Sequence, residues 1–341
     1  MEKRALGKSG LTVNPVGLGC MGFSHAYGAP TDRQTAVRTL REAVDLGYDF
    51  FDTAESYTGV NPDSSISYNE ELVGEALRDA RDKVVIATKM GVSHNPDRSL
   101  RLDSRPETIR KSVEGSLKKL GTDYIDLYYQ HRIDPRVEPE TVADTMAQLM
   151  KEGKIRAWGI SEATEDYLRR AHAVCPVAAI QNRYSMMARA HEALFPVCEE
   201  LNVAFVAFSP MANGFLTGAY RPGTQFTDGQ DYRAAMPQYT EEGYAKAQNL
   251  LELLTQLAEE KGGHHGTDLP GLDALQKALP RADPRLPKGG AAAGELRRRG
   301  NHPDAGGDHC HRRQTEHHGL CCVRRAQREI EDRVDAAYLN Q

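Results

Sequence analysis

The first 262 residues alternate between two hydrophobic patterns, and this alternation predicts an α/β fold with parallel strands. Short runs rich in β-branched and aromatic residues are typical of strands, and a segment with apolar positions at helical spacing follows each run. The expected strands lie at 15–19, 49–53, 83–89, 123–131, 155–161, 178–181 and 203–209. Because parallel strands need right-handed crossovers, this order favours a (β/α)8 TIM barrel, with a doubly wound open sheet as the alternative.

Two of the expected helices have sequence signals at their ends. Thr31 with Gln34, and Ser104 with Glu107, have the spacing of a capping box and predict the first turns of these helices. Gly121 predicts the end of the second helix, because glycine adopts the left-handed conformation that follows many helices.

The composition changes abruptly after residue 262. Of the 79 residues from 263 to 341, 11 are Leu, Ile, Val or Phe, which is about 14% and below the roughly 20% at which a packed core becomes doubtful. This segment also carries seven of the twelve His and three of the six Cys residues, and it contains no strand pattern. The chain therefore divides into a barrel at 1–262 and an anomalous tail at 263–341, and the eighth strand–helix unit is missing.

Three explanations of this tail are open: a diverged or disordered segment, a metal-binding appendage, or translation out of frame after Gly262. A metal site would have to use Cys310, His311, Cys321 and Cys322, whose spacing matches no zinc pattern. We favour the frame explanation, because the break falls without a linker where the repeated architecture should continue. Translation of the two other frames downstream of codon 262 would test it.

Charge and composition narrow the functional classes. The 341 residues carry 43 Lys and Arg against 48 Asp and Glu, and a net charge of −5 argues against a nucleic-acid partner, which calls for a basic surface. No apolar run approaches the roughly 20 residues that cross a bilayer, and the first ten residues lack the apolar part of a secretory signal. Six irregularly spaced cysteines favour a reducing compartment. We therefore expect a cytoplasmic protein with no membrane partner and no metal site.

Ionisable side chains stand at the ends of three successive strands. Asp52, Lys89 and His131 lie at the carboxyl ends of the second, third and fourth expected strands. Because these ends meet at one rim of a barrel, the three side chains are expected to be neighbours. Tyr57 follows Asp52 in the loop that leaves the same strand. Each residue alone has an ordinary structural explanation, but their shared position indicates a catalytic cluster.

These four side chains suit proton transfer to a substrate oxygen. A tyrosine hydroxyl is a weak acid at neutral pH, and a nearby ammonium group favours its phenolate and lowers its pKa. We expect Lys89 to supply that charge, Asp52 to hold Lys89 in place, and His131 to orient the substrate oxygen. Since none of the four is a source of hydride, a reduction requires a bound cofactor.

The remaining strand ends offer contacts for such a cofactor. Serine and glutamine suit a carboxamide, an aromatic face suits a flat heterocycle, and a glycine-containing loop lets backbone N–H groups approach phosphate. The residues in these positions are Ser161, Gln181, Phe208, Ser209, Pro210 and Gly214.

Several motifs together resemble the aldo-keto reductase family. They are the opening MEKRALGKSGLTVNPVGLGCMG, Asp52-Thr53-Ala54 with Tyr57, NEELVG at 69–74, ATK at 87–89, DLYYQH at 126–131, GIS at 159–161, Gln181 with Tyr184, FSP at 208–210 and GFLTG at 214–218. The resemblance covers 1–262 and implies a (β/α)8 barrel with an N-terminal β-hairpin that binds NADPH or NADP+ in extended form. It places the catalytic roles on Asp52, Tyr57, Lys89 and His131, with Tyr57 protonating a carbonyl oxygen.

The resemblance also adds Met21, Asp52 and Glu162 to the expected cofactor contacts. Two departures leave the chemistry in place: Glu162 stands where many relatives have Asn, and Phe208 stands where Tyr is common. A third departure is larger, since nothing in 263–341 matches the final strand and the basic segment that should contact the adenosine 2′-phosphate. We therefore expect weak cofactor affinity and impaired activity, and the preference between NADP and NAD stays open.

The expected function is NADPH-dependent reduction of a small aldehyde or ketone to an alcohol. One alternative is a non-catalytic, nicotinamide-binding regulatory subunit. Another is a barrel lyase that forms a Schiff base on Lys89, although an Asp52 partner works against the neutral amine that this role requires. The physiological substrate and the oligomeric state cannot be derived from these patterns.

Overall fold

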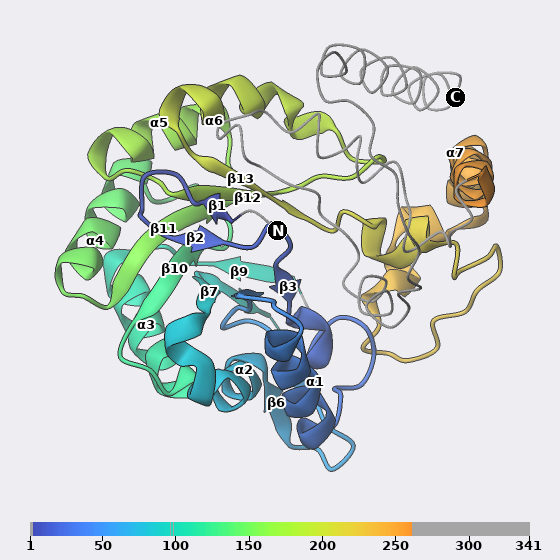
Figure 1. The fold of residues 1–341 in the computed structure, drawn as a ribbon, viewed down its shortest axis with the longest axis horizontal. Coiled ribbons are helices and arrows are strands. Elements are labelled where there is room, and N and C mark those ends of the chain that lie inside the picture. The colour runs from blue at the N-terminus through green and yellow to red at the C-terminus, as the bar shows by residue number, and fades with distance from the viewer. Residues whose placement is uncertain (1–2, 96, 98, 261–341) are drawn as a thin grey trace, which may run out of the picture. The chain divides into compact units, whose positions relative to one another are not determined.

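The computed structural model describes residues 3–260 apart from 96 and 98, and within them it contains a curled sheet of seven parallel strands (Figure 1). In sheet order the strands are β13 (Ala204–Phe208), β12 (Ala179–Arg183), β11 (Ile155–Ser161), β10 (Ile125–Gln130), β7 (Val85–Met90), β4 (Phe50–Asp52) and β3 (Leu18–Gly19). All neighbouring pairs are parallel. This is the predicted (β/α)8 barrel as far as the described residues extend. The tail at 263–341 and its three explanations lie outside them.

The helices from α1 to α6 alternate with these strands along the chain and cover the outer side of the curled sheet (Figure 1), whereas α7 belongs to the second compact unit described below. The α-helices are α1 (Arg33–Asp45), α2 (Asn69–Leu77), α3 (Pro106–Leu120), α4 (Pro139–Lys151), α5 (Glu165–Val174), α6 (Phe195–Leu201) and α7 (Glu241–Glu260). Short 3-10 helices are η1 (Met21–Phe23), η2 (Arg78–Lys83), η3 (Ala190–Leu194), η4 (Ala212–Thr217), η5 (Tyr232–Ala235) and η6 (Pro237–Tyr239). Among the described helices, none is both long and apolar enough to cross a membrane.

Antiparallel hairpins complete the secondary structure. The N-terminal hairpin pairs β1 (Arg4–Ala5) with β2 (Thr12–Val13), as predicted. In the loop after β4, β5 (Thr58–Val60) pairs with β6 (Ile66–Tyr68), and in the loop after β7, β8 (Val92–His94) pairs with β9 (Leu100–Leu102). The two later hairpins therefore leave the same rim as the predicted catalytic residues Asp52 and Lys89.

The described chain forms two compact units. Residues 3–210 with Gln225–Ala235 contain the whole sheet, and Met211–Thr224 with 236–260 form a second unit. Aromatic side chains pack inside the second unit, where the ring centroids of Phe215 and Tyr244 lie 4.8 Å apart. The predicted boundary at residue 262 lies outside the described residues.

Both capping-box predictions are wrong about the residue that begins the helix. The side chain of Asp32 caps α1 by accepting from the backbone N–H groups of the first turn, so Thr31 is not the cap. Ser104 does not cap α3, because Arg105 is the residue that precedes the helix and no side chain caps it; the Ser104 hydroxyl instead accepts from Gln130 Nε2 at 3.0 Å. The predicted end of α3 is confirmed, since Gly121 has a left-handed backbone with φ 64°.

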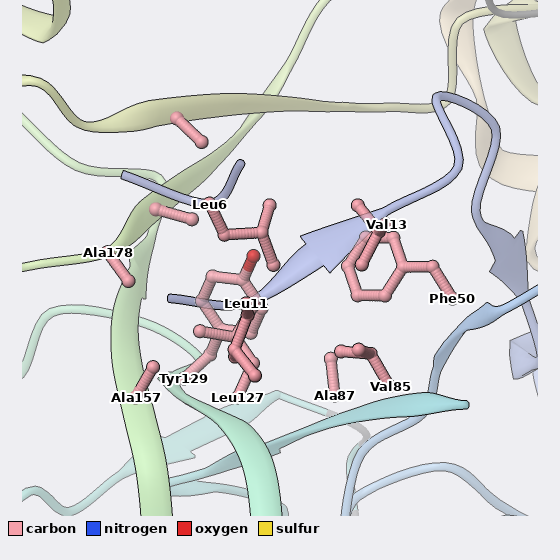
Figure 2. Packing of buried hydrophobic residues seen from close by; sticks show 12 residues of the cluster. Leu6, Leu11, Val13, Phe50, Val85, Ala87, Leu127, Tyr129, Ala157 and Ala178 are labelled. Atoms are coloured by element: carbon pink, nitrogen blue, oxygen red, sulfur yellow. The ribbon is translucent and has the colours of Figure 1, made fainter. Parts of the chain in front are cut away.

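Side chains alternate along each strand between the barrel interior and the helices. At the start of the strands, Leu6, Leu11 and Val13 of the N-terminal hairpin pack on interior residues, among them Leu127 and Tyr129 of β10 (Figure 2). The hairpin thereby covers the end of the sheet where the strands begin. The carboxyl ends of the strands lie at the opposite end, where the predicted site residues are found.

Candidate active site

Lys89 is the centre of the predicted catalytic group. Its side chain is buried at the end of β7, and its ammonium group donates to three oxygens: Oδ1 of Asp52, the carbonyl oxygen of Thr53 at 2.8 Å and the hydroxyl of Tyr57 at 3.3 Å. An ammonium group has three hydrogens, so all of them are engaged. The structure therefore brings Asp52, Lys89 and Tyr57 together as the sequence predicts.

His131 completes the group at the end of β10. The rings of Tyr57 and His131 meet edge to face with centroids 5.7 Å apart, and Lys89 Nζ lies 4.9 Å from the centroid of the Tyr57 ring. The His131 ring is also 3.3 Å from Ser56, measured from Nδ1 to Oγ. Four residues scattered along the sequence from 52 to 131 thus form one connected group, in which Lys89 contacts the Tyr57 hydroxyl and His131 contacts the Tyr57 ring.

Burial determines the direction of the Tyr57 pKa shift, whereas neighbouring groups determine the direction of the Lys89 shift. Burial raises the pKa of Tyr57 above its usual value, and Lys89 offsets only part of that rise. The predicted net lowering of the Tyr57 pKa is therefore wrong, because desolvation of the phenolate outweighs attraction to the ammonium. Burial alone would lower the pKa of Lys89, but Asp52 and Tyr57 raise it above its usual value. At neutral pH the pair is a neutral phenol beside a charged amine.

His131 is a neutral imidazole at physiological pH. Burial lowers its pKa well below the usual value, and the positive charges of Lys89 and Arg132 lower it further. The sequence left its charge open, and the structure favours the uncharged form. A neutral ring can donate from one nitrogen and accept at the other, which suits a hydrogen bond to an uncharged carbonyl oxygen.

The predicted carboxamide contacts lie side by side at the next two strand ends. Ser161 pairs with Gln181 in the register of β11 and β12. Gln181 donates from Nε2 to Oδ2 of Asp52 at 2.8 Å, so it also contacts the catalytic group. Ser161 accepts from Arg132 Nη1 at 3.1 Å. These contacts connect the two predicted parts of the site through hydrogen bonds.

The other predicted cofactor residues occupy different places. Glu162 has a left-handed backbone with φ 54°, and its Oε1 accepts from the Arg183 backbone N–H at 2.9 Å. Phe208 ends β13, where the Arg183 guanidinium carbon lies 5.7 Å from its ring centroid. Ser209 and Pro210 follow that strand, and Ser209 has φ 53°. Their contacts with a cofactor stay predictions.

Met21 and Gly214 are the last two predicted cofactor residues. Met21 begins η1 just after β3, and its carbonyl oxygen accepts from His25 N at 2.9 Å. Gly214 belongs to the second unit, where φ 95° requires a glycine-like backbone and an added Cβ would lie 2.9 Å from the Tyr220 ring. Its turn role is clear from this geometry, and its contact with phosphate stays a prediction.

Sequence reasoning missed three residues around Tyr57. The His25 ring stacks on Tyr57 with centroids 5.9 Å apart, and the His94 ring lies 5.4 Å from His25. Arg132 contacts Ser161 directly. His25 and His94 follow strand ends at a distance, so only the folded loops reveal them, whereas Arg132 is adjacent to His131 and could have been noted. Among the described residues, no group of three or more His, Cys, Asp or Glu side chains could hold a metal ion.

Comparison with known proteins identifies the family of this chain. The model of the aldo/keto reductase family matches residues 15–267. A probable aldo-keto reductase 1 of Glycine max is 37% identical over 257 residues, which cover 75% of this chain and 72% of that protein. A barrel with these residues at its rim is typical of an oxidoreductase, and the chain belongs to the aldo/keto reductase family.

Solved structures are similar to the described fold. The glycerol dehydrogenase AKR11B4 from Gluconobacter oxydans matches with a TM-score of 0.65 and 28% identity, covering 77% of this chain and 79% of that one. The holo form of the aldo-keto reductase AKR11C1 from Bacillus halodurans matches with a TM-score of 0.63 and 28% identity, covering 82% and 84%.

Proposed function

We propose that this protein reduces the carbonyl group of a small aldehyde or ketone with NADPH, and that Tyr57 supplies the proton. The observation that carries the proposal is the placement of Tyr57, whose hydroxyl lies 3.3 Å from Lys89 Nζ and whose ring meets the His131 ring edge to face. Family membership supports the reaction class, and the residue roles rest on this geometry.

The residues at the rim fit a nicotinamide cofactor. A carboxamide needs a donor for its oxygen and an acceptor for its nitrogen, and the Ser161 hydroxyl and the Gln181 amide oxygen supply one of each on adjacent strands. When bound, the cofactor supplies the hydride that no side chain of the group can provide. Ser161 and Gln181 would hold the nicotinamide end, with Met21, Glu162, Phe208, Ser209, Pro210 and Gly214 as further proposed contacts.

The protein side chains would donate the proton and stabilise the charge that develops on Tyr57. His131, neutral and held near Ser56, orients the substrate oxygen by donating a hydrogen bond. Tyr57 remains protonated at neutral pH, because burial raises its pKa, and can therefore give its proton to that oxygen. The charged Lys89 then stabilises the phenolate left on Tyr57, and Asp52 holds Lys89 in position.

The two other candidate functions have less support. A Schiff base on Lys89 requires a free amine, but Asp52 and Tyr57 raise the pKa of Lys89 and all three of its hydrogens are engaged. A purely regulatory nicotinamide-binding role would not require Lys89 and His131 to pack against Tyr57, and no observation on the described residues favours it.

Steady-state oxidation of NADPH with a panel of aldehydes and ketones tests the proposal. The wild-type protein should consume NADPH with at least one carbonyl compound, and Tyr57→Phe should lower kcat by about 100-fold or more, because it removes the acid. Turnover that is equal in the two proteins would refute the role of Tyr57. Borohydride trapping of a carbonyl compound on Lys89 without NADPH would instead support the lyase.

A further inference from the structure

Arg132 has no role in the mechanism above, although it lies between His131 and the predicted carboxamide site. Its side chain is half-buried, and its Nη1 donates to two oxygens, the carbonyl oxygen of His131 at 2.6 Å and Oγ of Ser161 at 3.1 Å. The first bond folds the guanidinium group back on the backbone of the preceding residue and fixes its position. The second bond joins it to the end of β11.

The hydrogen bond between Arg132 and Ser161 determines whether the serine hydroxyl donates or accepts. A guanidinium group has donors and no acceptor, so Ser161 Oγ must accept in its bond with Arg132. The hydroxyl therefore keeps its own hydrogen for another partner. Within the part of the chain that the structure describes, Arg132 is the one hydrogen-bond partner of Ser161 Oγ. A buried donor without an acceptor is costly, and a bound molecule can supply that acceptor.

The neighbouring side chains leave the donor role to Ser161. Gln181, next to Ser161 in the register, donates from Nε2 to Asp52 and offers its amide oxygen as an acceptor. Glu162 already accepts from the Arg183 backbone N–H, and a carboxylate cannot donate to a carbonyl oxygen. Because the Glu162 carboxylate cannot donate, a donor to the carboxamide oxygen must come from another residue.

We propose that Arg132 is a positioning residue for the cofactor, holding Ser161 so that the serine O–H donates to the oxygen of the nicotinamide carboxamide. The inference rests on the proposed function, since it requires a nicotinamide cofactor at this rim. Arg132 acts through Ser161 and does not itself touch the cofactor. The Arg132–Ser161 pair would thereby supply the donor that Glu162 cannot.

Calorimetric titration with two ligands measures how much the nicotinamide end contributes to the affinity for the cofactor. NADP+ is compared with 2′-phospho-ADP-ribose, which lacks the nicotinamide. Arg132→Met should weaken NADP+ binding about fivefold, the effect of one lost hydrogen bond, and leave 2′-phospho-ADP-ribose binding unchanged. Ser161→Ala should have the same selective effect. The double variant should bind NADP+ no more weakly than Ser161→Ala, because both substitutions remove the same interaction.

Other outcomes would overturn the inference. Equal weakening for both ligands would show a general disturbance of the site, and additive losses in the double variant would show that Arg132 acts independently of Ser161. Unchanged NADP+ binding in Arg132→Met would also refute it. A wild-type protein that binds NADP+ no more tightly than 2′-phospho-ADP-ribose would contradict this inference alone. A wild-type protein that binds neither ligand would contradict the proposed function as well.

Two further variants keep the experiment interpretable. Arg132→Leu also removes the donor to Ser161 and replaces Arg132→Met if that variant does not fold. Arg38→Met removes an exposed arginine from α1 and is the matched control. It should bind both ligands as the wild-type protein does.

Discussion

Gln181 Nε2 donates a hydrogen bond to Asp52 Oδ2 at 2.8 Å, although 129 positions separate the two residues in the sequence. The other carboxylate oxygen of Asp52 accepts from Lys89. Asp52 therefore connects β12, which carries a predicted carboxamide contact, with β7, which carries the amine beside Tyr57. Since each oxygen of Asp52 has a donor, the carboxylate is fixed in orientation, and it fixes the orientation of Lys89 in turn.

Replacing Asp52 should destabilise the protein strongly. Asp52→Asn leaves the buried Lys89 ammonium without its charged partner, and breaking a buried pair from one side costs about 3–5 kcal/mol. Urea unfolding followed by circular dichroism measures this loss. Glu152→Gln is the control, because it breaks surface ion pairs with Arg110 and Lys154 and should cost at most about 1 kcal/mol. Similar losses in the two variants would contradict the importance assigned to the Asp52–Lys89 pair.

Replacing Lys89 should change the pH dependence of catalysis as well as its rate. Lys89 partly offsets the rise that burial causes in the Tyr57 pKa, so Lys89→Met should raise the pKa of Tyr57 further. An acid is active while protonated, so activity falls as pH rises through its pKa. The alkaline decline of kcat should therefore move to higher pH in the variant, while kcat itself drops at every pH.

The pH profile of kcat measures both effects of Lys89→Met. Lys118→Met, an exposed change on α3, should keep the wild-type profile. An alkaline decline that stays in place while kcat falls would mean that Lys89 does not act on Tyr57 through its charge.

The alternation of strand side chains explains why the site could be predicted so closely. Ala87 of β7 and Tyr129 of β10 face the barrel interior, and Lys89 and His131 stand two positions after them. A period of two therefore directs both functional side chains to the inner side of the rim, and apolar residues earlier in the strand indicate that direction. Asp52, two positions after the interior Phe50, follows the same rule.

Some contacts of the site and the direction of the Tyr57 pKa shift could not be predicted from the sequence, because they depend on backbone turns and on burial. Arg132 lies just after β10 ends, where the period of two no longer applies, and its guanidinium group folds back on the His131 carbonyl oxygen. His25 reaches Tyr57 from the loop after β3, a contact without any sequence spacing. The direction of the Tyr57 pKa shift required a comparison of desolvation with the charge of Lys89, and only the folded structure supplies both.

His131 should make stability depend on pH below neutrality. Its folded pKa lies well below the usual value, so the unfolded chain binds a proton that the folded one does not. This contribution is complete above the unfolded pKa of about 6.5 and declines as pH falls below it, by at most about 1.4 kcal/mol per pH unit. The groups that oppose protonation are Lys89, Arg132, His94 and His25.

Comparison with His131→Asn isolates this contribution. The variant lacks the titrating ring, so the free-energy difference between the two proteins should move in favour of the variant as pH falls from about 7 to about 5. Urea unfolding at both pH values measures that change. A difference that is constant with pH would mean that His131 keeps an ordinary pKa in the folded protein.

The missing 2′-phosphate segment in 263–341 leads to a prediction about cofactor affinity. Because no sequence there matches the segment that should contact the 2′-phosphate, NADPH at micromolar concentration should raise the unfolding temperature only slightly. Thermal unfolding with and without NADPH measures this effect. A robust increase at micromolar NADPH would contradict the predicted weak binding and show that other contacts are sufficient.

Gly159 should be intolerant of any side chain, because Tyr129 fills the barrel interior beside it. A Cβ at this position would lie 2.4 Å from the Tyr129 ring and 2.5 Å from the carbonyl oxygen of Ala179, and a backbone atom cannot move aside cheaply. Gly159→Ala should therefore cost about 2–3 kcal/mol of stability. Because Tyr129 lies on β10 two positions before His131, displacement of its ring should also lower kcat.

Gly115 provides the matched control for this substitution. It lies inside α3 with nothing within 4 Å of an added Cβ, so Gly115→Ala should stabilise the protein by about 0.5–1 kcal/mol through helix propensity. The two alanine variants should thus shift the urea midpoint in opposite directions. If Gly159→Ala were as stable as the wild-type protein, the close packing of Tyr129 against β11 would be wrong, and with it the account of how the interior supports the rim.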